Sequence, residues 1–81
     1  MSLGKLPRLN GKELVKVLTK SGFVLVRVEG SHHIMRRPDG PIVVIPVHSG
    51  EEIGPGLLIR ILKKEINISR EEFERLVEKY L

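Results

Sequence analysis

The chain has 81 residues and no cysteine, with 14 Lys and Arg against 10 Asp and Glu and a formal net charge of +4. This length predicts one domain, near the lower limit for a chain that builds its own core. The absence of cysteine excludes a disulfide framework, a thiolate zinc site and a cysteine nucleophile, and the absence of a long apolar run or signal-peptide core favours a cytoplasmic protein without membrane association.

A first helix is predicted after Asn10. Asn10 and Glu13 have the spacing of a capping box, in which each side chain accepts a hydrogen bond from the other residue's backbone. Gly22 is expected to end this helix in a left-handed conformation. The residues between them show an apolar face at helical spacing and lysines on the opposite face (Leu14, Val15, Val17 and Leu18; Lys12, Lys16 and Lys20).

Three strands are predicted next, over residues 23–29, 32–37 and 42–46. The first and last segments are rich in β-branched residues, which favour strands. Gly30-Ser31 forms a tight connection between the first two strands, and Pro38-Asp39-Gly40 has the residue types of a turn. Three strands with two short connections predict an antiparallel meander.

Two further helices complete the expected order. Gly54-Pro55 marks the start of the second helix, with proline at the first helical position. Ser69 and Glu72 have capping-box spacing at the start of the third helix, where Ile68 is expected to pack against Phe73. The apolar residues of the two helices recur at helical spacing and are expected to be buried (Leu57, Leu58, Ile61 and Leu62; Phe73, Leu76, Val77 and Tyr80).

These elements predict an α+β fold in the order α-β-β-β-α, with a short C-terminal helix added. Two helices on one face of a three-stranded antiparallel sheet leave the other face for a ligand, as in double-stranded RNA-binding domains. The expected single domain spans residues 1–81, with its core in 10–64 and the C-terminal helix at 69–81. Met1-Ser2-Leu3 is treated as a possible remnant of cloning and carries no argument.

The histidines are the candidate reactive groups. His32 and His33 follow the glycine-led turn, and they should point to opposite faces of the second strand because side chains alternate along a strand. His48 lies after the third strand and comes close to the second strand only if the sheet pairs suitably. Each could also be an ordinary polar surface residue. Three histidines without a carboxylate cluster or an HExxH motif predict no metal site.

Positive charge is concentrated in the first part of the chain, which favours a polyanionic partner, above all RNA. Arg27, Arg36 and Lys12 are the candidate RNA-binding residues. The few aromatic side chains are expected in the core, so contacts to RNA should be mostly to phosphate and sugar. Two alternatives remain open at this point: a non-catalytic RNA-binding module, and an interaction domain with an acidic protein partner. The basic residues of this part are opposed only by Glu13 and Glu29 (Lys5, Arg8, Lys12, Lys16, Lys20, Arg27, Arg36 and Arg37).

A set of short motifs follows one order along most of the chain. They are Gly22-Phe23 with Arg27, Gly30-Ser31-His32-His33-Ile34, Pro38-Asp39-Gly40, Pro46-Val47-His48-Ser49, residues 56–63 and residues 68–73. From about Asn10 to Phe73, this order resembles the HicA toxin family of small mRNA interferases. The resemblance implies a fold like double-stranded RNA-binding domains, cleavage of mRNA, and neutralisation by a HicB-type antitoxin in a type II toxin–antitoxin pair.

The resemblance also implies a catalytic residue. In that family the histidine directly after Gly-Ser carries catalysis, and the matching position is His32, not His33. The chain departs from the family pattern at Met35, where aromatic or larger aliphatic residues are frequent, and at the basic pair Arg36-Arg37. Neither departure removes the histidine.

The chemistry of RNA cleavage agrees with this assignment. Imidazole, with an ordinary pKa of about 6.5, can remove a 2′-hydroxyl proton near neutral pH without a metal or other cofactor. Gly30 and Ser31 are expected to form the supporting turn, with Gly30 also allowing a backbone to approach closely. Arg27 and Arg36 are candidates to stabilise charge on the phosphate, and His48 is a candidate second group. The oligomeric state is not predicted.

Overall fold

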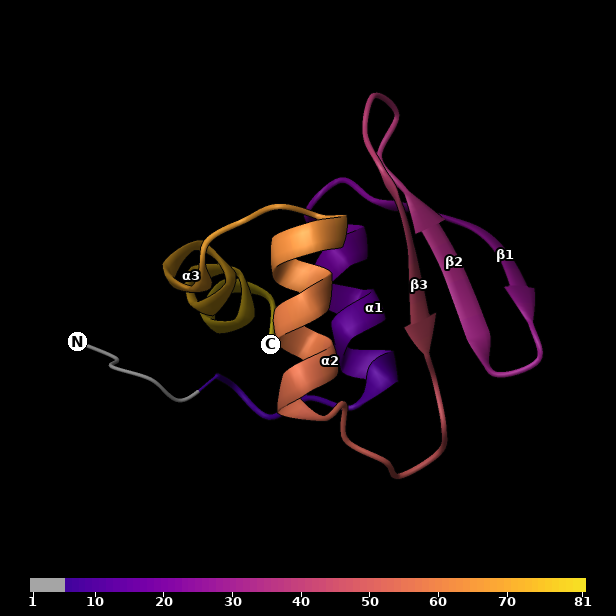
Figure 1. Ribbon diagram of the computed structural model, residues 1–81, viewed down its shortest axis with the longest axis horizontal. Coiled ribbons are helices and arrows are strands. Elements are labelled where there is room, and N and C mark those ends of the chain that lie inside the picture. Colours follow the sequence, from indigo (N-terminus) through magenta and orange to yellow (C-terminus); the bar gives the residue numbers. More distant parts are fainter. Residues whose placement is uncertain (1–5) are drawn as a thin grey trace.

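The protein folds as a three-stranded antiparallel sheet with three helices. Its computed structural model describes residues 6–81, so Met1-Ser2-Leu3 and Lys5 lie outside the described residues. Figure 1 shows α1 and α2 on one side of the sheet and α3 beyond them. The α+β fold class and the order of its elements are confirmed (α1 Gly11–Lys20, β1 Val24–Glu29, β2 His32–Arg36, β3 Ile42–Pro46, α2 Pro55–Arg60, η1 Ile61–Glu65 and α3 Arg70–Tyr80).

The start of α1 is held by side chains and by a close backbone contact. The Asn10 side chain accepts a hydrogen bond from the Glu13 N–H (2.8 Å), and the Glu13 carboxylate accepts one from the Asn10 N–H (3.0 Å), so the predicted capping box is complete. Gly11 is buried against the end of β3. A Cβ on Gly11 would collide with the Pro46 carbonyl oxygen and lie 2.9 Å from the Val47 Cα, so only glycine allows this approach.

The core lies between the inner face of the sheet and the helices. Met35 on β2 and Val43 and Ile45 on β3 are completely buried. Because side chains alternate along a strand, their neighbours His32, Ile34, Arg36, Ile42 and Val44 belong to the outer face. The inner residues join one apolar cluster with residues of all the helical segments (among them Leu14, Val17 and Leu18 of α1, Leu58, Ile61 and Leu62 of α2–η1, and Phe73 of α3).

β1 is one of the two edge strands of the sheet, and all six of its residues are exposed. The strand was predicted over residues 23–29, so it begins one residue later than expected. Phe23, the residue before the strand, is buried in the core. A bulge interrupts the pairing of β1 with β2 between Leu25 and Arg27. β1 extends beyond the cover that α1 provides, so residues on both of its faces meet solvent.

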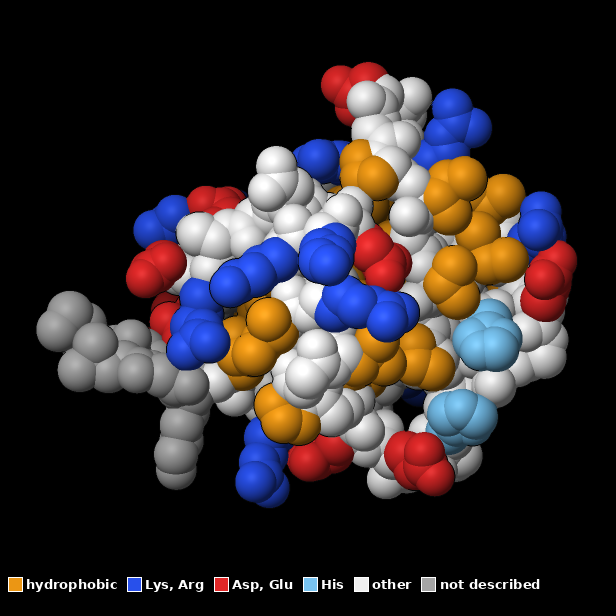
Figure 2. All heavy atoms as spheres, in the orientation of Figure 1, with side chains coloured by type: hydrophobic (Ala, Val, Ile, Leu, Met, Phe, Trp, Pro, Cys, Tyr) orange, Lys and Arg blue, Asp and Glu red, His pale blue; other side chains and the backbone are white. Residues whose placement is uncertain are grey.

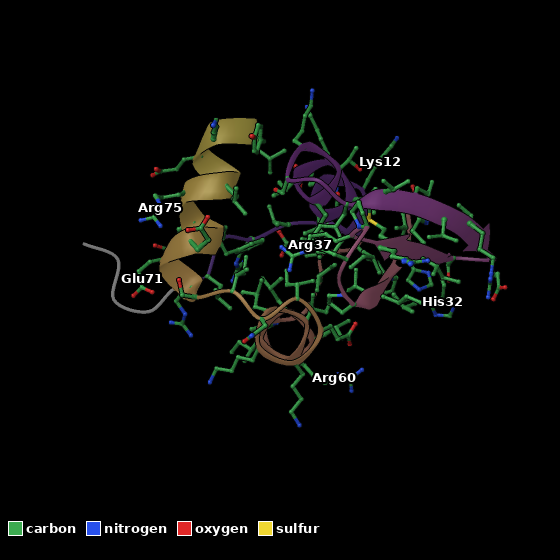
Figure 3. All side chains as sticks on the ribbon, turned by 90° about the horizontal axis from the view of Figure 1, so that it is seen from above. Lys12, His32, Arg37, Arg60, Glu71 and Arg75 are labelled. Carbon is green, nitrogen blue, oxygen red and sulfur yellow. The ribbon has the colours of Figure 1, made fainter. Side chains whose placement is uncertain are left out.

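β2 ends at Arg36, one residue before the predicted end. The Arg37 side chain turns inward, and its guanidinium lies 5.2 Å from the centre of the Phe23 ring. Figure 3 shows Arg37 among the helices and the sheet rather than on the outer surface. Arg37 thus lies outside the strand, and its guanidinium packs on an aromatic ring of the core.

The second helix contains a π-helical turn that sequence periodicity did not predict. α2 begins with Pro55 at the first helical position, as expected. The chain then continues as η1, where the Ile66 N–H donates to the Ile61 carbonyl five residues earlier (2.9 Å). Within residues 6–81, no helix is long and apolar enough to cross a membrane.

α3 has only half of its predicted capping box. The Ser69 hydroxyl accepts a hydrogen bond from the Glu72 N–H (3.0 Å), but the Glu72 carboxylate pairs with Arg75 (2.7 Å) instead of returning to Ser69. Phe73 is completely buried, while the other predicted apolar residues of this helix are half-buried (Leu76, Val77 and Tyr80).

Candidate active site

His32 is the first residue of β2, directly after the two-residue turn that joins β1 to β2. Gly30 has φ of +58°, and among the described non-glycine residues only Asn67 has a positive φ. A two-residue hairpin loop with positive φ at its first residue alone is a type II′ turn, which matches the twist of the strands it joins. Because this turn fixes the register, His32 lies opposite Glu29 on the outer face.

Within the protein, no atom uses the space beside Gly30. A Cβ at this position would have no heavy atom within 4 Å, so a close backbone approach at Gly30 stays a prediction for bound RNA. The positive φ is what favours glycine here. Gly30 therefore acts on His32 through the shape of the turn.

The sheet brings His48 to the end at which His32 lies. His32 pairs with Pro46 at the end of β3, and the Val47 N–H donates to the Ser31 carbonyl (2.6 Å). His48 is the residue after Val47. The strand pairing that would bring His48 close to the start of β2 is therefore present. His32 and His48 are both exposed. Figure 2 shows histidine side chains close to one another at this end of the sheet.

His33 lies on the other face of β2. It pairs with Val28 and with Ile45, so it belongs to the inner face with the core residues. Its ring is half-buried, and its Nδ1 atom is buried without a hydrogen-bond partner. His32 and His33 thus point to opposite faces, as predicted, and cannot act as one unit.

Of the three predicted RNA-binding residues, the strand register places only Arg27 near His32, two residues from Glu29 on the neighbouring strand. Arg27 and Arg36 share its outer face, but the Arg27 Nε donates to the Glu29 carboxylate (2.6 Å). Arg36 is exposed four residues along β2, which is roughly 13 Å of strand. Figure 3 shows Lys12 and His32 on opposite sides of the sheet.

A second group of cations lies nearer to the side on which His32 is exposed. Arg60 ends α2, and Lys63 and Lys64 lie in the last turn of η1, all of them exposed. Figure 2 shows Lys and Arg side chains gathered over α2, and Figure 3 places Arg60 on the same side of the molecule as His32. Arg60 has a distant ion pair with Glu65 (3.9 Å). We call these three residues the α2–η1 cations.

The α2–η1 cations were visible in the sequence only as outward-facing residues at helical spacing. Their relation to His32 depends on how α2 packs beside the sheet, and the spacing alone cannot predict that packing. No group of three or more His, Cys, Asp or Glu side chains placed to hold a metal ion occurs within residues 6–81.

The chain matches a family model. The model is described as "HicA toxin of bacterial toxin-antitoxin", and it matches residues 11–66. The matched range runs from the start of α1 to the residue after η1, and it includes the hairpin turn, all three histidines and the α2–η1 cations. No curated protein matches the chain.

Proposed function

The chain belongs to the HicA toxin family of bacterial toxin–antitoxin systems, and on this basis we propose that it is an endoribonuclease that cleaves mRNA with His32 as general base. The observation that carries the proposal is the position of His32. It is exposed on the uncovered face of the sheet, at the end where His48 also lies, within the range that the family model matches. RNA can therefore reach the imidazole without any movement of the core.

The proposed reaction needs no metal. The unprotonated nitrogen of His32 takes the proton of a 2′-hydroxyl group, and the 2′-oxygen forms a bond to phosphorus. The bond from phosphorus to the 5′-oxygen breaks, and this oxygen takes a proton from the His48 imidazolium or from water. The products are a 2′,3′-cyclic phosphate and a 5′-hydroxyl. Exposed imidazoles at one end of the sheet support this division of roles.

Cations are proposed to hold the RNA backbone on either side of His32. Arg36 lies too far along β2 to contact the phosphate at His32, so it would hold another part of the strand. Arg27 is partly neutralised by Glu29, which weakens its attraction for phosphate. The α2–η1 cations offer three positive charges on the side where His32 is exposed. Lys12 stays a predicted contact, and RNA would have to pass around the sheet to reach it.

The family description places the chain in a toxin–antitoxin system, which implies an antitoxin partner. We propose that the partner is a HicB-type antitoxin and that the pair acts in the cytoplasm, where mRNA is translated. Because His32 is exposed, a protein that covers this end of the sheet would be sufficient to inhibit cleavage.

The test is cleavage of a labelled single-stranded RNA in excess EDTA. We compare the wild type with His32→Ala and with His33→Ala, which removes the same group from the opposite face. We expect His32→Ala to abolish cleavage while RNA binding persists. We expect His33→Ala to cleave, because its ring points away from the RNA side. Thermal unfolding of all three proteins checks that they are folded.

Two results would contradict the proposal. An undiminished rate in folded His32→Ala would remove His32 from the mechanism. If the wild type binds RNA but never cleaves it, the chain acts as a non-catalytic RNA-binding module. In that case both variants should bind as the wild type does.

A further inference from the structure

The sheet exposes an apolar surface that the proposed chemistry does not use. Val24 and Ile42 are each 58% exposed, and Val28 is 49% exposed, although these residue types are usually buried. Figure 2 shows hydrophobic side chains gathered over the sheet, next to the histidines. We call this set of residues the apolar sheet surface (Val24, Leu25, Val26, Val28, Ile42 and Val44).

Two features of β1 indicate that a partner must reach its edge. Val24 pairs with Arg36 and belongs to the outer face, whereas Leu25 and Val28 pair with the inner residues Met35 and His33. Apolar side chains are therefore exposed on both faces of one strand. β1 also ends the sheet, so its outward backbone N–H and C=O groups are free to pair with another strand. A partner that covered only one face would leave the apolar side chains of the other face exposed to solvent.

The chemistry of this surface fits a protein better than RNA. RNA strands bind through cations and through aromatic rings on which bases stack, and the apolar sheet surface contains only aliphatic side chains. Arg27, Glu29 and Arg36 are the charged residues of β1 and β2, which leaves a net positive charge beside the aliphatic groups. An extended segment with aliphatic and acidic side chains complements both properties.

We propose that the apolar sheet surface binds the antitoxin, which adds an extended, apolar and acidic segment along the free edge of β1. This inference rests on the proposed function for the identity of the partner. Glu29, the last residue of β1, lies opposite His32. A segment that follows β1 to its end therefore reaches the candidate active site. The same contact would then hold the antitoxin on the toxin and block access of RNA to His32.

The experiment measures binding of the antitoxin that we propose as the partner. Titration calorimetry compares the wild type with Val24→Lys and with Val44→Lys, which place a charge on the apolar sheet surface. Leu81→Lys is the matched control, because Leu81 is also an exposed aliphatic residue but lies outside this surface. We expect the two sheet variants to weaken binding by roughly tenfold or more, and the control to bind as the wild type does.

An RNA cleavage assay on the same proteins separates this inference from the proposed function. Added lysines should not weaken RNA binding, so Val24→Lys and Val44→Lys should still cleave, but the antitoxin should no longer inhibit them. If the wild type does not cleave RNA, the proposed function fails, while the affinities still test the docking surface.

Two outcomes would overturn the inference. One is wild-type affinity of both folded sheet variants for the antitoxin. The other is that the wild type forms a dimer, the lysine variants are monomers, and affinity for the antitoxin is unchanged. The apolar sheet surface would then join two copies of this chain.

Discussion

Gly11 and Gly56 both lie in the first turn of a helix, but their surroundings differ. A Cβ on Gly11 would meet the backbone of Pro46 and Val47, whereas one on Gly56 would have no heavy atom within 4 Å. We expect Gly11→Ala to lower the free energy of unfolding by roughly 1–3 kcal/mol, because the end of β3 must move. Gly56→Ala should raise it by up to about 1 kcal/mol, because alanine favours the helix.

Urea unfolding of the two variants checks this pair. Equal stability of Gly11→Ala and the wild type would show that α1 and the end of β3 can separate without cost. The capping box beside Gly11 could be predicted from sequence, because Asn10 and Glu13 are three residues apart. The contact of Gly11 could not, because Pro46 belongs to a strand whose position depends on the whole sheet.

At the scale of elements, the α2–η1 cations give the clearest prediction for RNA binding. In a His32→Ala background, which prevents cleavage, we change Arg60, Lys63 and Lys64 to glutamine. Each phosphate contact with a single strand contributes about 0.7 to the slope of log affinity against log salt concentration, so the slope should fall by up to about 2. Fluorescence anisotropy with a labelled single-stranded RNA measures it.

A charge-matched control uses three exposed lysines elsewhere, Lys16, Lys20 and Lys79. Their replacement by glutamine should change the slope much less, because Lys16 and Lys20 follow Lys12 at helical spacing on α1, away from His32. Equal slopes for the two triple variants would mean that RNA is held by overall charge and not by α2–η1.

The elements themselves were largely predictable. The strand bounds agree to within one residue, because the turns at Gly30-Ser31 and Pro38-Asp39-Gly40 have local residue signals. The π-helical turn of η1 and the inward turn of Arg37 were not predicted. Arg37 packs on Phe23, which belongs to another part of the chain, and periodicity does not report such a contact.

At the scale of the whole molecule, α3 is part of the core. Phe73 is completely buried in the cluster that includes the sheet and α1, and α3 packs against α1. We expect Phe73→Ala to lower the free energy of unfolding by about 3–5 kcal/mol, a large part of the stability of so small a domain. Leu81→Ala, at an exposed position of the same end, should change it by about 0.5 kcal/mol or less.

Thermal and urea unfolding of both variants test this prediction. A small loss with Phe73→Ala would mean that α3 can leave the rest of the domain intact. The buried position of Phe73 was predicted from the helical spacing of its segment. The exposure of β1 was not predicted, because a segment rich in valine and leucine resembles a core strand in composition. Only the position of α1 shows that β1 lies beyond its cover.

The position of Phe73 after α1 and the sheet in the sequence also affects the order of events during synthesis. The ribosome makes α1 first, but α3, which covers α1, follows roughly 50 residues later, a delay of several seconds at bacterial rates of translation. Until then the nascent chain has an open core. Under the proposed function, the nuclease reaches its folded state only after residues 70–80 have been made, so a nascent chain that already contains His32 cannot yet cut RNA.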